Sequence, residues 1–129
     1  MQNSDGGFGE SILSYYDAAL KGQGKSTASQ TAWALIGLLA TVGPKDPASE
    51  RAAAWLTEHQ NEDGSWDEPE FTGTGFPCVF YLKYHLYRNS FPLYALARFD
   101  NMRKGRRKSF ALQMPAEEMQ HLIGSGGNG

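Results

Sequence analysis

The sequence predicts an all-α fold built from helical hairpins, and three observations lead to this prediction. Residues 30–42, QTAWALIGLLATV, are apolar on nearly every face, as expected for an inner, buried helix. Residues 47–60 place charged side chains on one face and apolar side chains on the other, as expected for an outer helix. No two segments make a convincing strand pair. Pairs of inner and outer helices stack into α-solenoids or close into α/α barrels.

The first half of the chain contains the predicted hairpin. Residues 1–28 are rich in Gly, Ser and Asn, so we expect a loop with a short helical turn. Local sequence signals bound the two helices: Ser29 as the N-cap of the first, Gly43–Pro44 as its end, Asp46 as the N-cap of the second and Pro47 as its first residue. A long loop is expected over residues 61–77.

The second half is expected to contain two more helices with a short break between them. Their predicted bounds are Phe76 or Cys78 to Arg88 for the third, a break at Asn89–Ser90, and a fourth with Pro92 near its start that fades near Lys104. We expect residues 1–105 to form one domain that begins inside a repeat. Residues 106–129, which end in GSGGNG, are expected to be a disordered tail.

Composition and charge limit the classes of function. The chain has 129 residues, of which 40% are hydrophobic, as expected for one globular domain. The net charge of -2 gives no reason to expect a nucleic-acid partner. Cys78 is the only cysteine and the three histidines are scattered, so we expect no intramolecular disulfide, metal or cofactor. The longest apolar run, 32–40, is too short to cross a bilayer.

Basic side chains gather where the predicted domain ends: Arg98, Arg103, Lys104, Arg106, Arg107 and Lys108. Such a cluster is typical of solvated cations at a helix C-terminus, where they complement the helix dipole. Contact with anionic lipid headgroups is the alternative interpretation.

A short motif occurs twice in the sequence. Residues 55–66 read WLTEHQNEDGSW, and residues 2–8, QNSDGGF, repeat the second half of it. In the complete copy we expect Gln60 to bond free groups at adjacent helix ends, Gly64 to permit the turn, and Trp66 to fold over the glutamine with its indole N–H as a donor. An ordinary helix end with an Asp-Gly turn is the plainer alternative. A calcium loop is a poor alternative because no Glu follows at ligand spacing.

The complete spacing resembles the QW motif of triterpene cyclases and, more weakly, the repeat of protein prenyltransferase β subunits. The matching residues are Arg51, Trp55, Gln60, Gly64 and Trp66. Residues 73–99, GTGFPCVFYLKYHLYRNSFPLYALARF, resemble the C-terminal region of bacterial squalene–hopene cyclases, as do DEPEFTG and SQTAWALIGLLA before them. The resemblance covers residues 2 to about 104. It implies that the chain is a fragment of an (α/α)6 barrel, an α/α toroid.

Four aromatic residues share one side of the predicted third helix: Phe76, Phe80, Tyr84 and Tyr87, at i, i+4, i+8 and i+11, within an arc of about 80°. Such a stripe is typical of a plain core face. In the resembled family these positions line the reaction cavity, where aromatic faces stabilise carbocations. The resemblance also implies cavity positions for Phe8, where the family usually has Trp, and for Tyr15, near the catalytic acid.

The acidic motif that starts the family's reaction, DxDD, does not occur in this sequence, and neither does the metal-binding DDxxD. We therefore predict no catalytic residue in this chain and no cyclisation by it alone. Asp67, Glu68 and Glu70 form the only dense carboxylate cluster, and we expect them to be solvated turn residues.

The resemblance implies a parent enzyme with a defined reaction and location. That reaction is the acid-initiated cyclisation of squalene to hopene or hopanol in hopanoid biosynthesis, with a squalene-like polyprenoid as substrate. The remainder of the cyclase would be the partner of this chain, and the enzyme would be monotopic on the cytoplasmic side of the bacterial membrane. Two alternatives stay open. One is an oxidosqualene, tetrahymanol or sesquarterpene cyclase of the same fold, and the other is a non-catalytic helical-repeat interaction module.

Overall fold

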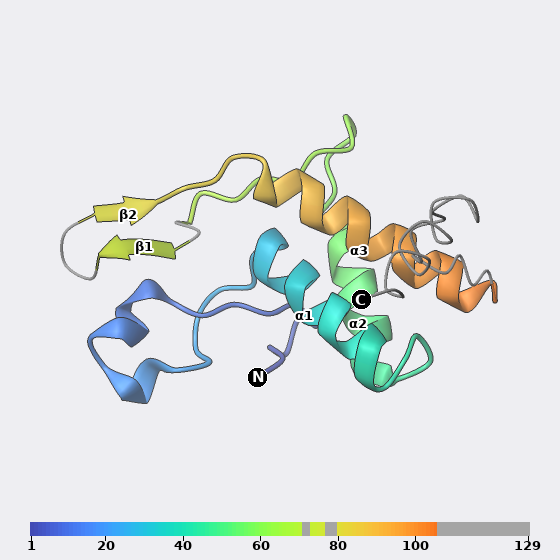
Figure 1. The fold of residues 1–129 in the computed structure, drawn as a ribbon, viewed down its shortest axis with the longest axis horizontal. Helices are drawn as coiled ribbons and strands as arrows, with labels where there is room; N and C mark the ends of the chain where they lie inside the picture. The colour runs from blue at the N-terminus through green and yellow to red at the C-terminus, as the bar shows by residue number, and fades with distance from the viewer. Residues whose placement is uncertain (71–72, 77–79, 106–129) are drawn as a thin grey trace, which may run out of the picture.

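Three α-helices form the body of the protein, α1 (Ala28–Thr41), α2 (Pro47–Glu58) and α3 (Tyr87–Arg103) (Figure 1). The computed structural model describes residues 1–70, 73–76 and 80–105, with side chains described outside 71–82. Two 3-10 turns, Ile12–Tyr15 and Ala18–Leu20, precede α1. The prediction of a helical fold is therefore confirmed, and the predicted tail over 106–129 lies outside the described residues.

The first hairpin forms largely as its sequence predicts. The side chain of Asp46 accepts a hydrogen bond from the Ala48 N–H at 2.9 Å, and Pro47 occupies the first turn of α2. Gly43, after α1, has a φ of +88°, a backbone angle that favours glycine. Ser29 is not the N-cap of α1, because Thr27 caps this helix by accepting from the Gln30 N–H.

A short antiparallel strand pair replaces much of the predicted third helix. The strands are β1 (Gly73–Phe76) and β2 (Phe80–Leu82), and an irregularity interrupts their register between Thr74 and Phe76. The helix prediction was wrong here for two local reasons. Pro77 disfavours helical backbone at the residue before it, and the Phe-Tyr-Leu run has high strand propensity.

The last helix begins at Tyr87 and continues through the predicted break at Asn89–Ser90. Asn89 lies in its first turn, where the side-chain carbonyl accepts a hydrogen bond from the Trp66 N–H at 3.0 Å. Pro92 lies inside the helix and is buried, and its missing N–H removes one backbone hydrogen bond of the helix. The helix nevertheless runs unbroken to Arg103.

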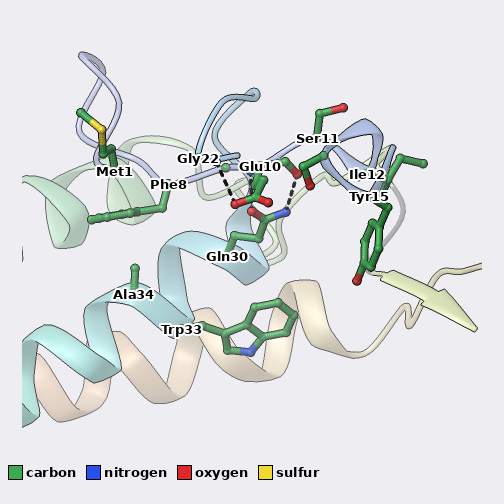
Figure 2. A pocket seen from close by; sticks show the side chains of 12 residues that line it. Met1, Phe8, Glu10, Ser11, Ile12, Tyr15, Gly22, Gln30, Trp33 and Ala34 are labelled. Atoms are coloured by element: carbon green, nitrogen blue, oxygen red, sulfur yellow. Dashed lines mark hydrogen bonds between the residues drawn. The ribbon is translucent and has the colours of Figure 1, made fainter. Parts of the chain in front are cut away.

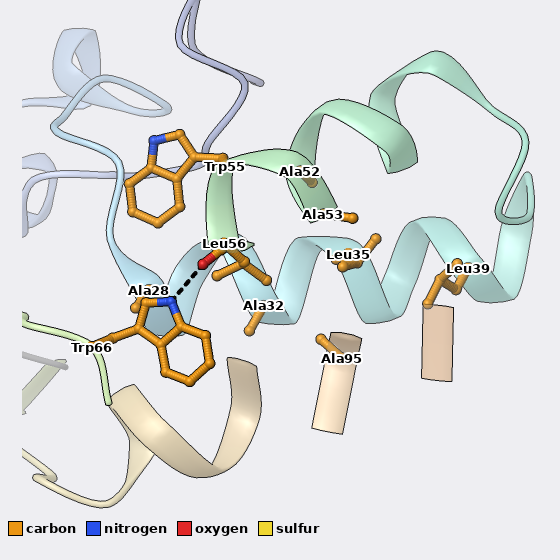
Figure 3. Close-up of a cluster of buried hydrophobic side chains, with 10 residues drawn as sticks. All are labelled: Ala28, Ala32, Leu35, Leu39, Ala52, Ala53, Trp55, Leu56, Trp66 and Ala95. Atoms are coloured by element: carbon orange, nitrogen blue, oxygen red, sulfur yellow. Dashed lines mark hydrogen bonds between the residues drawn. The ribbon is translucent and has the colours of Figure 1, made fainter. Parts of the chain in front are cut away.

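The hydrophobic core lies where α1 meets the other two helices (Figure 3). Four α1 residues with helical spacing face inward, Ala28, Ala32, Leu35 and Leu39. They meet residues of α2, α3 and the loop after α2: Ala52, Ala53, Trp55, Leu56, Trp66 and Ala95. The many alanines allow the helix backbones to approach closely. The core thus fixes α1 as the central helix, as predicted for the inner member of the hairpin.

The two copies of the motif hold helices together in different ways. Trp66 is buried and donates its indole N–H to the Leu56 carbonyl at 2.8 Å, which ties the loop to the end of α2. The prediction that Gln60 bridges to a neighbouring helix end was wrong within the described residues, because its amide donates to the Gly64 carbonyl in its own turn at 3.0 Å. The Gln2 amide makes the bridge instead, donating to the Ala48 carbonyl of α2 at 2.9 Å and accepting from Arg51.

Candidate functional site

A cavity of about 390 Å³ lies between the N-terminal loop and α1 (Figure 2). Phe8, Tyr15 and Trp33 contribute its aromatic walls, with Glu10 and Gln30 between them. Phe8 and Tyr15 therefore line one cavity, and the role in the reaction cavity that the resemblance implies for them stays a prediction. Tyr15 is 59% exposed, so the cavity is open on that side.

Polar contacts hold the loop against α1 at the centre of this cavity. The Gln30 side chain accepts from the Glu10 N–H at 2.6 Å and donates to the Glu10 carbonyl at 3.3 Å. The Ser14 hydroxyl and the Gly22 N–H donate to the Glu10 carboxylate and lower its pKa, so it is ionised at neutral pH. These contacts fix the loop that carries Phe8 and Tyr15.

Phe8 is held through its backbone on both sides. Its N–H donates to the Thr31 hydroxyl at 2.9 Å, and its carbonyl accepts from the Thr27 N–H at 3.0 Å. Both partners belong to the first turn of α1 or its cap. The side chain packs partly buried against the core cluster, so Phe8 serves the core and the cavity together.

A second aromatic group lies at the start of α3. The rings of Tyr84 and Tyr87 stack with centroids 4.8 Å apart and an angle of 21° between them. The Trp33 ring meets Tyr87 at 6.0 Å and 80°, and meets Phe91 at 5.6 Å and 76°, both in edge-to-face geometry. Trp33 thus belongs to both aromatic groups.

The predicted stripe of four rings on a single helix was wrong. Only Tyr87 lies in α3, Tyr84 precedes the helix, and Phe76 and Phe80 lie in β1 and β2. The backbones of Phe76 and Phe80 are paired across the two strands, and their side chains lie outside the described residues. The structure therefore brings Tyr84 and Tyr87 together, while the cavity roles predicted for all four residues remain predictions.

One polar residue differs from its predicted environment. Glu68 is not a solvated turn residue, because it is 5% exposed and its carboxylate accepts from the Ser29 N–H at 2.7 Å and the Ser29 hydroxyl at 2.9 Å. The exposed Asp63 accepts from the hydroxyl and the N–H of Ser65 within its turn, and these hydrogen bonds lower its pKa. In the part of the chain with described side chains, no cluster of three His, Cys, Asp or Glu could hold a metal ion.

Trp33 is the aromatic residue that the sequence interpretation missed. It directly follows the buried Ala32, so it projects about 100° away from the core stripe of α1. This angular offset is the sequence feature that could have identified Trp33, because a Trp beside the buried face of a helix contacts other residues than that face does. An apolar run such as 30–42 obscures the offset, since every face of the helix then resembles core.

Comparison with known proteins gives one consistent family. Residues 1–101 match the family described as the squalene-hopene cyclase C-terminal domain. The chain is 52% identical over 109 residues to the squalene–hopene cyclase of Bradyrhizobium diazoefficiens, with 80% of this chain and 16% of that protein covered. It is 53% identical over 91 residues to the squalene–hopene cyclase of Alicyclobacillus acidocaldarius, covering 70% of this chain and 14% of that protein.

A plant protein is similar to the same degree. The chain is 54% identical over 100 residues to the dammaradiene synthase of Dryopteris crassirhizoma, covering 74% of this chain and 15% of the synthase. The chain thus spans only about one sixth of the length of the curated relatives it matches. The matched region includes both copies of the motif, α1, α2 and most of α3, and the matched family has an α/α toroid fold. The chain belongs to the squalene–hopene cyclase C-terminal domain family.

Proposed function

We propose that this chain supplies part of the cavity wall of a squalene–hopene-type cyclase, which converts squalene to hopene or hopanol. One observation carries the proposal. Aromatic side chains from segments far apart in sequence gather beside α1, with Phe8 and Tyr15 on its loop side and Tyr84 and Tyr87 on its α3 side. A cation over an aromatic face is stabilised by about 2 kcal/mol when it is shielded from water.

The proposed reaction uses these rings without changing them. An acid adds a proton to the terminal double bond of squalene, and the electrons of successive double bonds then close the rings. The last cation loses a proton to give hopene, or captures water to give hopanol. The acid would come from the part of the cyclase outside this chain. The residues described here would stabilise the migrating charge and keep water away from it.

The exposure of two of these rings supports a cavity that is completed by other parts of the enzyme. Tyr15 is 59% exposed and Tyr84 is 47% exposed in this chain. Rings with this exposure are accessible to a neighbouring element or a ligand. The remainder of the cyclase is the proposed cover, with the polyprenoid chain enclosed between the two parts.

A hybrid cyclase tests this proposal. Residues 1–101 replace the matching segment of the Bradyrhizobium diazoefficiens enzyme, and the purified hybrid is incubated with squalene. We expect hopene or hopanol as the main product, and a variant without the acidic motif of the host enzyme serves as the inactive control. A hybrid with native-like helix content that leaves squalene unconsumed would contradict the proposal. A main product other than hopene or hopanol would favour the alternative of another cyclase of the same fold. The similarity with dammaradiene synthase also points to that alternative.

The parent enzyme is also proposed to be monotopic, on the cytoplasmic side of the bacterial membrane. Within the described residues, no helix is long and apolar enough to span a membrane. Exposed Leu86, Leu93 and Tyr94 near α3 could contact lipid. Flotation of the 129-residue chain with anionic and with neutral phospholipid vesicles tests this surface, and an absence of binding to both would contradict a membrane contact through this region.

A further inference from the structure

The three tryptophans of this chain fall into two classes. Trp55 and Trp66 are 6% and 1% exposed, and each indole N–H has a protein acceptor: the Asp5 carboxylate at 3.1 Å and the Leu56 carbonyl at 2.8 Å. Both therefore have the burial and the satisfied donor expected of structural tryptophans. Trp33 is only partly buried, and its indole N–H makes no hydrogen bond within the described residues. A purely structural role explains Trp33 less well than it explains the other two.

Trp33 also occupies the point where the two aromatic groups meet. It lines the cavity of about 390 Å³ together with Phe8 and Tyr15, and Figure 2 shows its ring projecting from α1 below Gln30 toward the side of Tyr15. Its ring meets Tyr87 at 6.0 Å in edge-to-face geometry, and Tyr87 stacks on Tyr84 at 4.8 Å. The indole thus continues the aromatic surface from the loop side of α1 to its α3 side.

The contacts from α3 fix the orientation of the indole. Tyr87 and Phe91 are four residues apart on α3, and both meet the Trp33 ring at angles near perpendicular, 80° and 76°. Edge-to-face pairs contribute about 0.5–1.5 kcal/mol each beyond the area that they bury. Two such contacts hold the indole in one pose without covering the part of it that lines the cavity.

We propose that Trp33 is a substrate-contacting residue of the cyclase cavity, which stabilises a carbocation of the polyprenoid through its indole face. This inference rests on the proposed cyclase function. Trp gives the strongest cation–π attraction of the aromatic side chains. When that attraction is lost, a cation that forms beside residue 33 loses its proton to water before the remaining rings close. The product then contains fewer rings and keeps more double bonds than hopene.

The hybrid cyclase defined above gives the test, with three variants compared for turnover and product mixture. Trp33→Leu removes the aromatic face, Trp33→Phe keeps a smaller one, and Trp66→Phe alters a buried tryptophan remote from the cavity lining. For Trp33→Leu we expect turnover to fall by roughly 10- to 30-fold and the share of partly cyclised products to rise about tenfold. Trp33→Phe should recover most of the fully cyclised share. Trp66→Phe should lower the yield of folded enzyme and leave the product mixture unchanged.

The product mixture distinguishes contact with substrate from a structural role. It depends on whether the carbocation in each active site closes further rings or loses a proton, and not on the amount of folded enzyme. If Trp33→Leu lowers turnover but gives the same product mixture as the unmodified hybrid, Trp33 is structural and the inference is overturned. Unchanged turnover and products would overturn it as well. An unmodified hybrid that forms no cyclised product would instead overturn the proposed function on which the inference rests.

Discussion

Ser29 and Glu68 are joined by two hydrogen bonds across 39 residues of sequence. The backbone N–H and the hydroxyl of Ser29 donate to the two carboxylate oxygens of Glu68, at 2.7 Å and 2.9 Å. Both residues are buried, and the carboxylate also lies at the positive end of the α1 dipole. This pair fixes the loop after α2 to the first turn of the central helix, and so fixes the helix that carries Trp33.

Replacement of Glu68 by Ala should loosen the first turn of α1. The substitution leaves two buried donors without an acceptor, at a cost of about 1–3 kcal/mol each. We expect the Ser29 amide in the hybrid cyclase to exchange its hydrogen roughly 10- to 100-fold faster, measured by hydrogen–deuterium exchange mass spectrometry on peptides that cover the start of α1. The control is Asp67→Ala, since the Asp67 side chain is exposed. Equal exchange in the two variants would show that the carboxylate does not hold the helix.

The turn glycines of the two motif copies should differ in their tolerance of alanine. Gly6 and Gly64 both have positive φ, +92° and +84°, so either substitution strains the backbone by about 1 kcal/mol. A Cβ at Gly6 would also lie 3.0 Å from the Arg51 carbonyl, whereas the nearest atom to a Cβ at Gly64 is the Gln60 amide at 3.8 Å. Gly6→Ala should therefore lower the unfolding temperature of the hybrid more than Gly64→Ala does, as followed by circular dichroism. The reverse order would contradict the observed approach of the first turn to α2.

Asp5 should make the stability of the N-terminal turn depend on pH. Desolvation raises the pKa of Asp5, but hydrogen bonds from Ser26, Gly7 and Trp55 outweigh it and hold the pKa below its ordinary value of 3.8. A carboxylate with a lowered pKa stabilises the fold above its unfolded pKa, and this contribution is lost as pH falls through the folded pKa. Asp5→Asn should therefore unfold at a lower temperature than the unmodified hybrid from pH 5 to 8, and the difference should shrink below about pH 4.

The control for this prediction is Asp67→Asn, which replaces an exposed carboxylate. Its unfolding temperature should follow that of the unmodified hybrid over the same range. A difference between Asp5→Asn and the unmodified protein that stays constant down to pH 3 would mean that ionisation of Asp5 does not stabilise the turn.

Sequence reasoning succeeded where local chemistry decides the structure. Asp46 and Pro47 set the start of α2 through contacts within three residues of sequence, and the spacing of the motif identified the family. It failed for Ser29, because Thr27 offers an equally good cap two residues earlier, while the true partner of Ser29 is Glu68, remote in sequence. No local pattern contains that pairing.

The aromatic stripe shows a different kind of failure. The four rings do have helical spacing in the sequence. Their segment is not one helix, however, because β1 and β2 occupy its first part. Tyr84 and Tyr87 nevertheless stack, because a spacing of three residues also brings side chains together in the turn that leads into α3. Trp33 was missed because its contacts with Tyr87 and Phe91 come from a helix more than fifty residues later in the chain.

Photolabelling with a squalene analogue tests most directly whether this chain forms a wall of the cavity. The analogue carries a diazirine near the middle of the polyprenoid chain, is irradiated in the hybrid cyclase, and is located by peptide mass spectrometry. We expect the label on peptides that contain Phe8, Trp33 or the Tyr84–Tyr87 pair, and we expect excess squalene to suppress it. Labelling confined to the host portion of the hybrid, with none on residues 1–101, would contradict the central claim.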